Sequence, residues 1–169
     1  MAFLIEDDIL APKGAILIEY KGLNPFSIYG KIRDMILTVF HARGVDYFED
    51  DFRWDTTGEP INFFVRIHVD KKVDKWTRGY VYLRVQGSQP RDPLKPGWIQ
   101  IEVSGKVSTA YPTETMFQKA IFYPFLYPYH YLMYNNIRRR YIRIYKEWIE
   151  HLEMEIRSTF NLMQRARLT

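Results

Sequence analysis

The stretch INFFVRIHVD, residues 61–70, alternates apolar and polar side chains and decides the fold. Every second position is apolar, namely Ile61, Phe63, Val65, Ile67 and Val69. Successive side chains of a β-strand point to opposite faces of a sheet, so this pattern predicts a strand with one buried face and one face in water. A sheet covered on both faces is excluded, because its strands would be apolar throughout.

The same alternation recurs along the chain and predicts an antiparallel meander over residues 46–111. The further runs are VDYFEDDFRWD (45–55), RGYVYLRVQG (78–87) and GWIQIEVSGKV (97–107), separated by turn-rich TTGEP, DKKVDK and GSQPRDPLKPG. Phe48, Phe52 and Trp54 are expected to share one face of the first run. The predicted wet face carries Arg66, His68, Tyr82, Arg84, Gln100, Glu102 and Lys106.

Upstream of the meander, GAILIEYKG (14–22) predicts a fifth strand, followed by a short helix over about residues 25–43. Asn24 suits the N-cap position and Pro25 the first helical position, where its missing N–H costs nothing. Gly44 is a suitable stop for this helix. The apolar face of this predicted sheet must be covered by an apolar element, on that face only.

A long C-terminal helix over about residues 129–165 is expected to supply that cover. Its apolar positions recur every 3.6 residues or so, and Arg139, Arg143, Glu147 and Glu150 fall on the opposite side. Pro124 and Pro128 interrupt the chain before it. At roughly 55 Å, the helix exceeds what a small sheet needs, so we expect one end to project.

The stretch AIFYPFLYPYHYLMYNNIRRRYIRIY, residues 120–145, allows three interpretations. It is too short and too interrupted for a membrane span, although tyrosines followed by arginines suit a bilayer surface. Tyrosine and arginine also suit nucleic acid. Helical spacing favours the third interpretation, in which the tyrosines line the inner side of the C-terminal helix.

Composition sets wider limits on the chain, which we expect to form a single α+β domain over residues 1–169. Cysteine is absent, which excludes disulfides and thiolate metal sites. The acidic N-terminus does not resemble a signal peptide, so a cytoplasmic location is expected. The net charge of +4 is uneven: residues 1–60 hold six basic and eleven acidic side chains, and residues 116–169 hold nine and four.

The order of these elements resembles the helix-grip fold of the START/Bet v 1-like (SRPBCC) superfamily. In that superfamily a curved antiparallel sheet wraps a C-terminal helix around a cavity. The resemblance lies in the order of elements and in no sequence motif; five predicted strands and a longer helix depart from the usual pattern. It implies that an apolar small molecule binds between sheet and helix.

The leading hypothesis is therefore a non-catalytic domain that holds an apolar or aromatic small molecule. The predicted ligand-binding residues are Phe63, Val65, Val81, Leu83, Ile101, Tyr134, Tyr141, Tyr145 and Trp148. No catalytic residue, metal site or cofactor is predicted. The acidic run Glu49, Asp50, Asp51 and Asp55 is interpreted as a solvated strand edge.

Two alternatives stay open. In the first, the C-terminal helix docks to RNA, a ribonucleoprotein or a protein assembly through Arg138, Arg139, Arg140 and Arg143. In the second, the chain is a self-assembling structural subunit that uses Tyr80, Tyr82 and Trp98 on the wet face.

Overall fold

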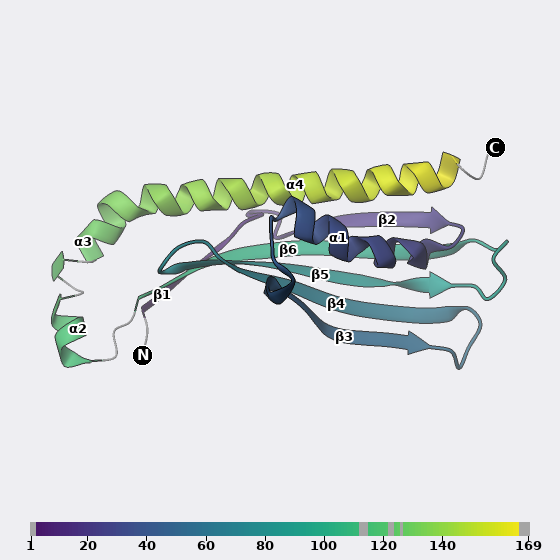
Figure 1. The fold of residues 1–169 in the computed structure, drawn as a ribbon, viewed down its shortest axis with the longest axis horizontal. Helices are drawn as coiled ribbons and strands as arrows, with labels where there is room; N and C mark the ends of the chain where they lie inside the picture. Colours follow the sequence, from purple (N-terminus) through teal and green to yellow (C-terminus); the bar gives the residue numbers. More distant parts are fainter. Residues whose placement is uncertain (1–2, 112–114, 122–123, 126, 166–169) are drawn as a thin grey trace.

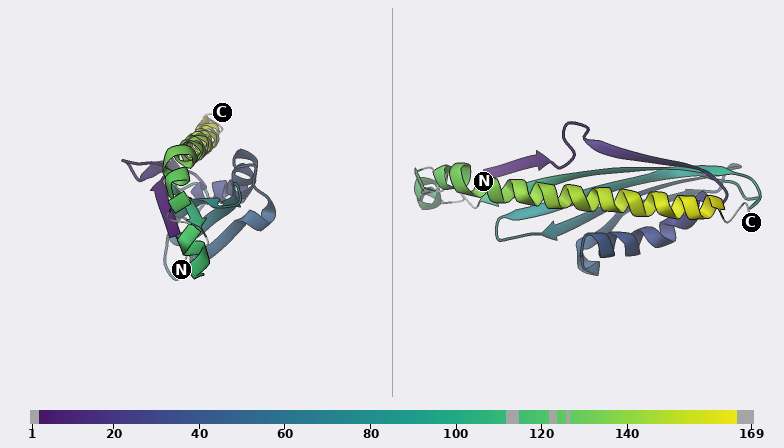
Figure 2. Two further views of the ribbon diagram at one scale, coloured as in Figure 1. Left: turned by 90° about the vertical axis from the view of Figure 1, so that its left-hand side faces the viewer. Right: turned by 90° about the horizontal axis from the view of Figure 1, so that it is seen from above.

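Six antiparallel strands form one open sheet in the computed structural model, which describes residues 3–111, 115–121, 124–125 and 127–165. The strands are β1 (Phe3–Asp8), β2 (Ala15–Gly22), β3 (Tyr47–Asp55), β4 (Ile61–Lys72), β5 (Thr77–Gln89) and β6 (Gly97–Tyr111). Two helices, α1 (Tyr29–Val39) and α4 (Asn135–Arg165), lie side by side on one face (Figure 1, Figure 2). The α+β class and the helical cover on a single sheet face are as predicted.

One edge of the sheet is built from two strands in line. The 15-residue strand β6 pairs with β2 along residues 97–104 and with β1 along residues 106–111. Beyond β6 the order continues through β5 and β4 to β3 at the other edge. Strand β1 was not predicted, because its acidic sequence FLIEDD gives no clear alternation.

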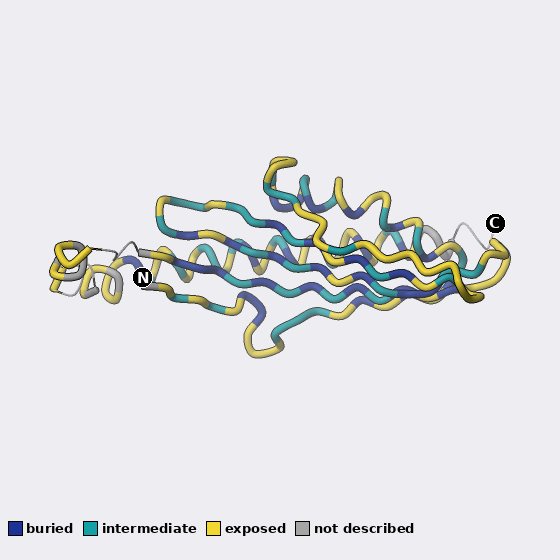
Figure 3. Tube along the Cα trace, turned by 90° about the horizontal axis from the view of Figure 1, so that it is seen from below, coloured by how far each residue is buried: buried dark blue, intermediate teal, exposed yellow. Residues whose placement is uncertain are grey.

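Burial alternates along the central strands as the sequence predicts (Figure 3). In β5, Val81, Leu83 and Val85 are fully buried, whereas Tyr82 is half-buried and Arg84 is exposed. The apolar face supports α1 and α4, and the opposite face meets water.

Phe48 lies on the opposite face of the sheet from Phe52 and Trp54, so the expectation that all three share a face is wrong for Phe48. Asp50 has no partner in the register of β3 against β4 and forms a β-bulge. One extra residue reverses the direction of every side chain beyond it. Phe48 therefore stacks on His68 of the wet face, with ring centroids 4.8 Å apart, while Phe52 and Trp54 lie on the helix side.

The N-terminal helix is shorter than predicted. It begins with a 3-10 turn at Pro25–Ile28 and α1 ends at Val39 rather than near residue 43. His41, with φ of 47°, takes the left-handed conformation beyond the helix end that was assigned to Gly44. Asn24 has a positive φ of 46° and its side chain makes no capping hydrogen bond.

The C-terminal helical run begins near the predicted residue 129, because α3 (Tyr127–Tyr129), the π-helical segment His130–Tyr134 and α4 follow one another without a break. Its first turns project past the sheet as expected, whereas α4 itself stays within the length of the sheet. Helix α4 has 31 residues, or about 46 Å, and β6 with 15 residues spans about 50 Å. The part of the chain that extends past the sheet is the segment before α4 (Figure 1). It contains α2 (Met116–Ile121), α3 and the π-helical segment.

Candidate functional site

The sheet residues predicted to line a ligand cavity lie in the core. Phe63, Val65, Val81, Leu83 and Ile101 are each 3% exposed or less. They belong to one cluster of buried side chains that includes residues of α1 and α4. The structure brings these five residues together as predicted. The space around them is occupied by the other side chains of the core.

On the helix side, Tyr145 and Trp148 pack into the same region. Tyr145 is 1% exposed, and its ring lies 5.0 Å from that of Trp148. Lys71 of β4 places its Nζ 4.9 Å from the centre of the Trp148 ring and donates hydrogen bonds to the carbonyl oxygens of Phe40 and His41. The lysine thus satisfies carbonyls beyond the end of α1 and joins β4, α1 and α4.

Tyr134 lies elsewhere, in a polar cluster at the β4–β5 turn. Its hydroxyl is 2.6 Å from Asp74 Oδ2 and 2.5 Å from Thr77 Oγ1, and Thr77 lies 3.0 Å from Thr109. An ionised carboxylate only accepts hydrogen bonds, so Tyr134 donates to Asp74 and the Thr77 hydroxyl donates to Tyr134. This cluster anchors the start of the C-terminal helix to the sheet.

Asp74 is the acceptor at the centre of this cluster. Its Oδ1 accepts from the backbone N–H groups of Trp76 and Thr77, each at 2.8 Å. Burial acts to raise the pKa of the Asp74 carboxyl, but the hydrogen bonds from Tyr134, the two amides and Tyr141 outweigh it and hold the pKa below its usual value. The predicted ligand residues Tyr134 and Tyr141 therefore share a protein partner.

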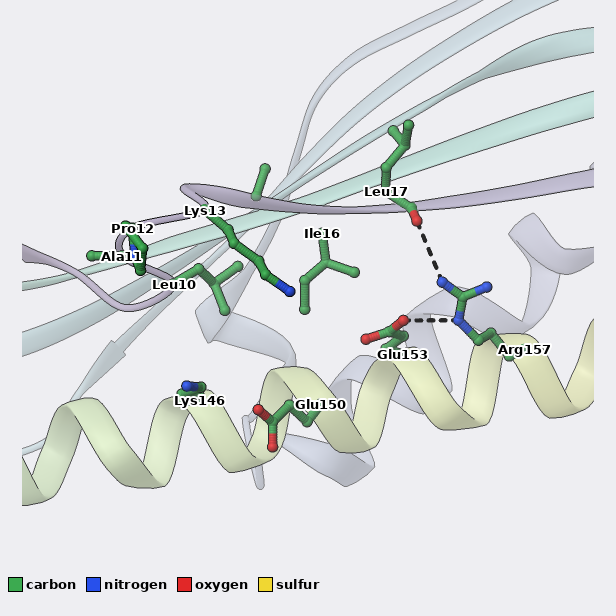
Figure 4. Close-up of a pocket in the computed structure, with 11 residues that line it drawn as sticks. Leu10, Ala11, Pro12, Lys13, Ile16, Leu17, Lys146, Glu150, Glu153 and Arg157 are labelled. Atoms are coloured by element: carbon green, nitrogen blue, oxygen red, sulfur yellow. Dashed lines mark hydrogen bonds and ion pairs between the residues drawn. The ribbon is translucent and has the colours of Figure 1, made fainter.

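A cleft lies between the free edge of β2 and helix α4 (Figure 4). It has a volume of about 430 Å³. The strand side contributes Leu10, Ala11, Pro12, Lys13, Ala15, Ile16 and Leu17, and α4 contributes Lys146, Glu150, Glu153 and Arg157. None of the nine predicted ligand-binding residues lines it.

Arg157 divides this cleft from a second one along the same strand edge. Its guanidinium is 2.8 Å from Glu153 and donates to the Leu17 carbonyl oxygen at 3.4 Å. The second cleft, of about 230 Å³, lies between Ile18–Tyr20 and the C-terminal half of α4. Sequence reasoning missed both clefts because β2 was not recognised as an edge strand lying beside the helix.

The four arginines predicted to bind a partner separate into two groups. Arg138 forms an ion pair with Asp7 of β1 at 3.1 Å and its side chain is only 16% exposed. Arg139, Arg140 and Arg143 are exposed and form no ion pair with any acid in the described part of the chain. We call these three residues the arginine stripe, because helical spacing places them on one side of α4.

The segment before α4 exposes large apolar side chains, among them tyrosines that the sequence analysis assigned to the inner side of the C-terminal helix. We call residues 116–134 the aromatic arm, of which residues 122–123 and 126 lie outside the described part. Seven of its side chains are exposed by 43–89% of their surface: Met116, Phe117, Phe125, Tyr129, Tyr131, Leu132 and Met133. Of the three arm tyrosines whose side chains the structure describes, Tyr129, Tyr131 and Tyr134, only Tyr134 points inward as expected.

The wet-face residues Tyr80, Tyr82 and Trp98 do not form one patch. Tyr80 and Tyr82 stack on the wet face with centroids 6.4 Å apart, and both are half-buried. Trp98 of β6 pairs with Ser88 of β5. Ser88 is eight residues from Tyr80 along β5, a distance of about 26 Å. The structure therefore separates the residues predicted to mediate self-assembly.

Ion pairs neutralise much of the wet face. Three of them cross between strands: Arg78–Asp70 at 2.7 Å, Arg84–Glu102 at 3.2 Å and Lys106–Glu6 at 2.8 Å. Asp51 pairs with Arg53 at 2.7 Å as predicted, while the bulge turns Glu49 to the hydroxyl of Tyr29 on the helix side. Within the described residues, no three His, Asp or Glu side chains are arranged to hold a metal ion.

Comparisons with known proteins provide little further information. No known protein family matches the sequence, and no curated protein is significantly similar to it. Among solved structures, the chain is similar to a protein of unknown function, SA2116 from Staphylococcus aureus, with 8% identity and a TM-score of 0.31 over 97% of this chain and 98% of that one. No helix in the described part of the chain is both long and apolar enough to cross a membrane.

Proposed function

We propose that this protein is a non-catalytic docking module that binds a partner through the aromatic arm and the arginine stripe. The observation that supports this function is the exposure of seven large apolar side chains in the arm, led by Met116 at 89% and Phe117 at 74%. Contact with water is unfavourable for a large apolar side chain. A concentration of such exposed side chains on one segment is typical of a contact surface.

The remainder of the fold suits a scaffold for that surface. The sheet–helix interface is occupied by Tyr145 and its neighbours, and the buried hydroxyl cluster around Tyr134 fixes the point where the arm leaves the body. The arginine stripe begins five residues after Tyr134, so the two surfaces are continuous along the chain.

Affinity capture from an extract of cells that naturally express the protein tests this function. The arm variant combines Phe117→Ser, Phe125→Ser and Leu132→Ser; the stripe variant combines Arg139→Gln, Arg140→Gln and Arg143→Gln. A matched control combines Leu94→Ser and Met154→Ser, two apolar residues on the body that are 81% and 62% exposed.

We expect wild type and control to retain the same lipid, nucleic acid or protein, and the arm variant to lose it. The stripe variant should retain it less well at low salt. Its binding should also depend less on salt than that of wild type, because the charge attraction that salt screens is largely absent. Equal recovery by all four proteins would refute the docking function.

A second candidate is the binding of a small molecule, which the 430 Å³ cleft between β2 and α4 favours. That volume lies in the range of small-molecule sites, and the position beside the C-terminal helix is compatible with membership of the helix-grip superfamily. Native mass spectrometry before and after denaturation tests it. A compound released only by denaturation would support this candidate, and its loss in an Ile16→Trp variant would assign it to the cleft.

A further inference from the structure

The stretch of sequence that holds the aromatic arm and the arginine stripe carries charge of one sign. From residue 116 to residue 146 the sequence holds six basic side chains and no acidic one. Lys146 continues the arginine stripe one turn further along α4, and the first acid after it is Glu147. The exposed apolar side chains and the exposed cations therefore follow each other in sequence without an intervening acidic residue. The two carboxylates that reach this junction from the sheet side, Asp7 and Asp74, are bound by Arg138 and Tyr134.

The position of the arm leaves this surface accessible. Helices α2 and α3 lie beyond the end of the sheet, at the opposite end of the molecule from the last residues of α4 (Figure 1, Figure 2). Arg138, which is nearest to the arm, is bound to Asp7 of the body, so the arm is held at a fixed point while Arg139 and Arg140 face solvent.

We infer that the partner of this surface is an anionic lipid bilayer, on which the arm lies without crossing it. Phenylalanine, leucine and methionine side chains enter the boundary between headgroups and acyl chains, and tyrosines remain at headgroup level. The arginine stripe lies at the same end and can pair with lipid phosphates. This inference rests on the docking function proposed above and names its partner.

Single-stranded RNA suits the exposed side chains less well. Stacking on bases would use Phe117, Phe125, Tyr129 and Tyr131. It would leave Met116, Leu132 and Met133 in water, although each of them is more than 60% exposed. A bilayer takes up the aliphatic and aromatic side chains together, which is why the observations favour lipid.

Flotation with vesicles tests the inference on the full chain. Vesicles of phosphatidylcholine alone are compared with vesicles that also contain phosphatidylglycerol, and a labelled single-stranded RNA homopolymer is offered in parallel. The arm and stripe variants are compared with wild type and with two controls. One control is Leu94→Ser with Met154→Ser, and the other removes three exposed cations of the body: Lys21→Gln, Lys31→Gln and Lys95→Gln.

We expect wild type and both controls to float with the anionic vesicles. The arm variant should lose flotation on both kinds of vesicle. The stripe variant should bind the anionic vesicles roughly 100-fold more weakly, because each cation near an anionic surface contributes to binding and three are removed. Circular dichroism and the thermal midpoint of each variant establish that it is folded.

Three results would overturn the lipid assignment. If wild type binds the RNA in a salt-sensitive manner and ignores both vesicles, the docking function stands and its partner is RNA. If wild type binds neither the vesicles nor the RNA, but captures a protein from cell extract that the arm variant alone fails to capture, the partner is a protein. If every variant behaves as wild type in flotation and capture, both the lipid assignment and the docking function fail.

Discussion

The ring of Tyr145 fills the space beside Gly79 that a side chain would otherwise occupy. A Cβ placed on Gly79 would lie 2.1 Å from Tyr145 Cζ, far inside van der Waals contact. Tyr145 is 1% exposed, and burial raises the pKa of its hydroxyl above the usual range. The absence of a side chain at residue 79 therefore allows α4 to approach β5 closely, with the tyrosine ring between them.

Gly79→Ala should lower the free energy of unfolding by about 1–3 kcal/mol, because the new methyl group forces the ring or the helix to move. Urea denaturation measures the loss. Gly30→Ala is the matched control: nothing lies within 4 Å of its added Cβ, and in α1 alanine is a better helix former than glycine. A combined Gly79→Ala, Tyr145→Leu variant should recover part of the loss; equal stability of wild type and Gly79→Ala would contradict the contact.

Tyr134→Phe should destabilise the protein by about 1–3 kcal/mol, because the change removes the donor to Asp74 and the acceptor for Thr77 in a buried cluster. Thermal unfolding followed by circular dichroism measures it. Tyr131→Phe serves as control, since Tyr131 is 68% exposed on the aromatic arm. Equal midpoints for the two variants would show that the Tyr134 hydroxyl does not anchor the helix.

Acid should weaken the fold partly through Asp74. Its pKa in the folded state lies below the usual value, so the unfolded chain binds the proton first as the pH falls. The contribution to stability is complete above about pH 4 and is lost as the pH falls through the folded pKa. Asp74→Asn should lower stability at neutral pH and give a flatter stability profile below about pH 4 than wild type. Parallel profiles would exclude the carboxylate as the titrating group.

The four consecutive or near-consecutive arginines should differ in their effect on stability. Arg138→Ala leaves the carboxylate of Asp7 without its partner in a partly buried position, and we expect a loss of about 1–2 kcal/mol. The triple change Arg139→Ala, Arg140→Ala and Arg143→Ala should alter stability by no more than about 0.5 kcal/mol, because these side chains are exposed. Chemical denaturation of both variants checks the difference; a reversed order would refute it.

The regular elements of this fold could be predicted because their signals are local. Alternation along β4, β5 and β6 fixed which face is buried, and the 3.6-residue period of α4 placed Tyr145 and Leu152 on the inner side. A period persists over many residues, so one irregular position does not conceal it.

What could not be predicted depends on contacts between distant parts of the chain. The bulge at Asp50 reverses Phe48 by a shift of one residue, and no local pattern announces it. Strand β1 exists because β6 is long enough to pair with it beyond β2. The exposure of Tyr129 and Tyr131 follows from where the sheet ends, which the spacing of tyrosines does not encode.

The two-part edge formed by β1 and β2 also bears on the order of folding. Its residues pair with partners far along the chain, as Phe3 does with Tyr111, whereas the β3–β6 meander joins strands that are neighbours in sequence. Closing such a long loop costs entropy before any contact is gained, so we expect the meander to form early and the first 22 residues to join late. During synthesis these residues must wait for β6 to be made. A circular permutant in which the first 22 residues follow α4 through an added linker brings β1 closer to β6 in sequence, and it should refold faster in stopped-flow experiments.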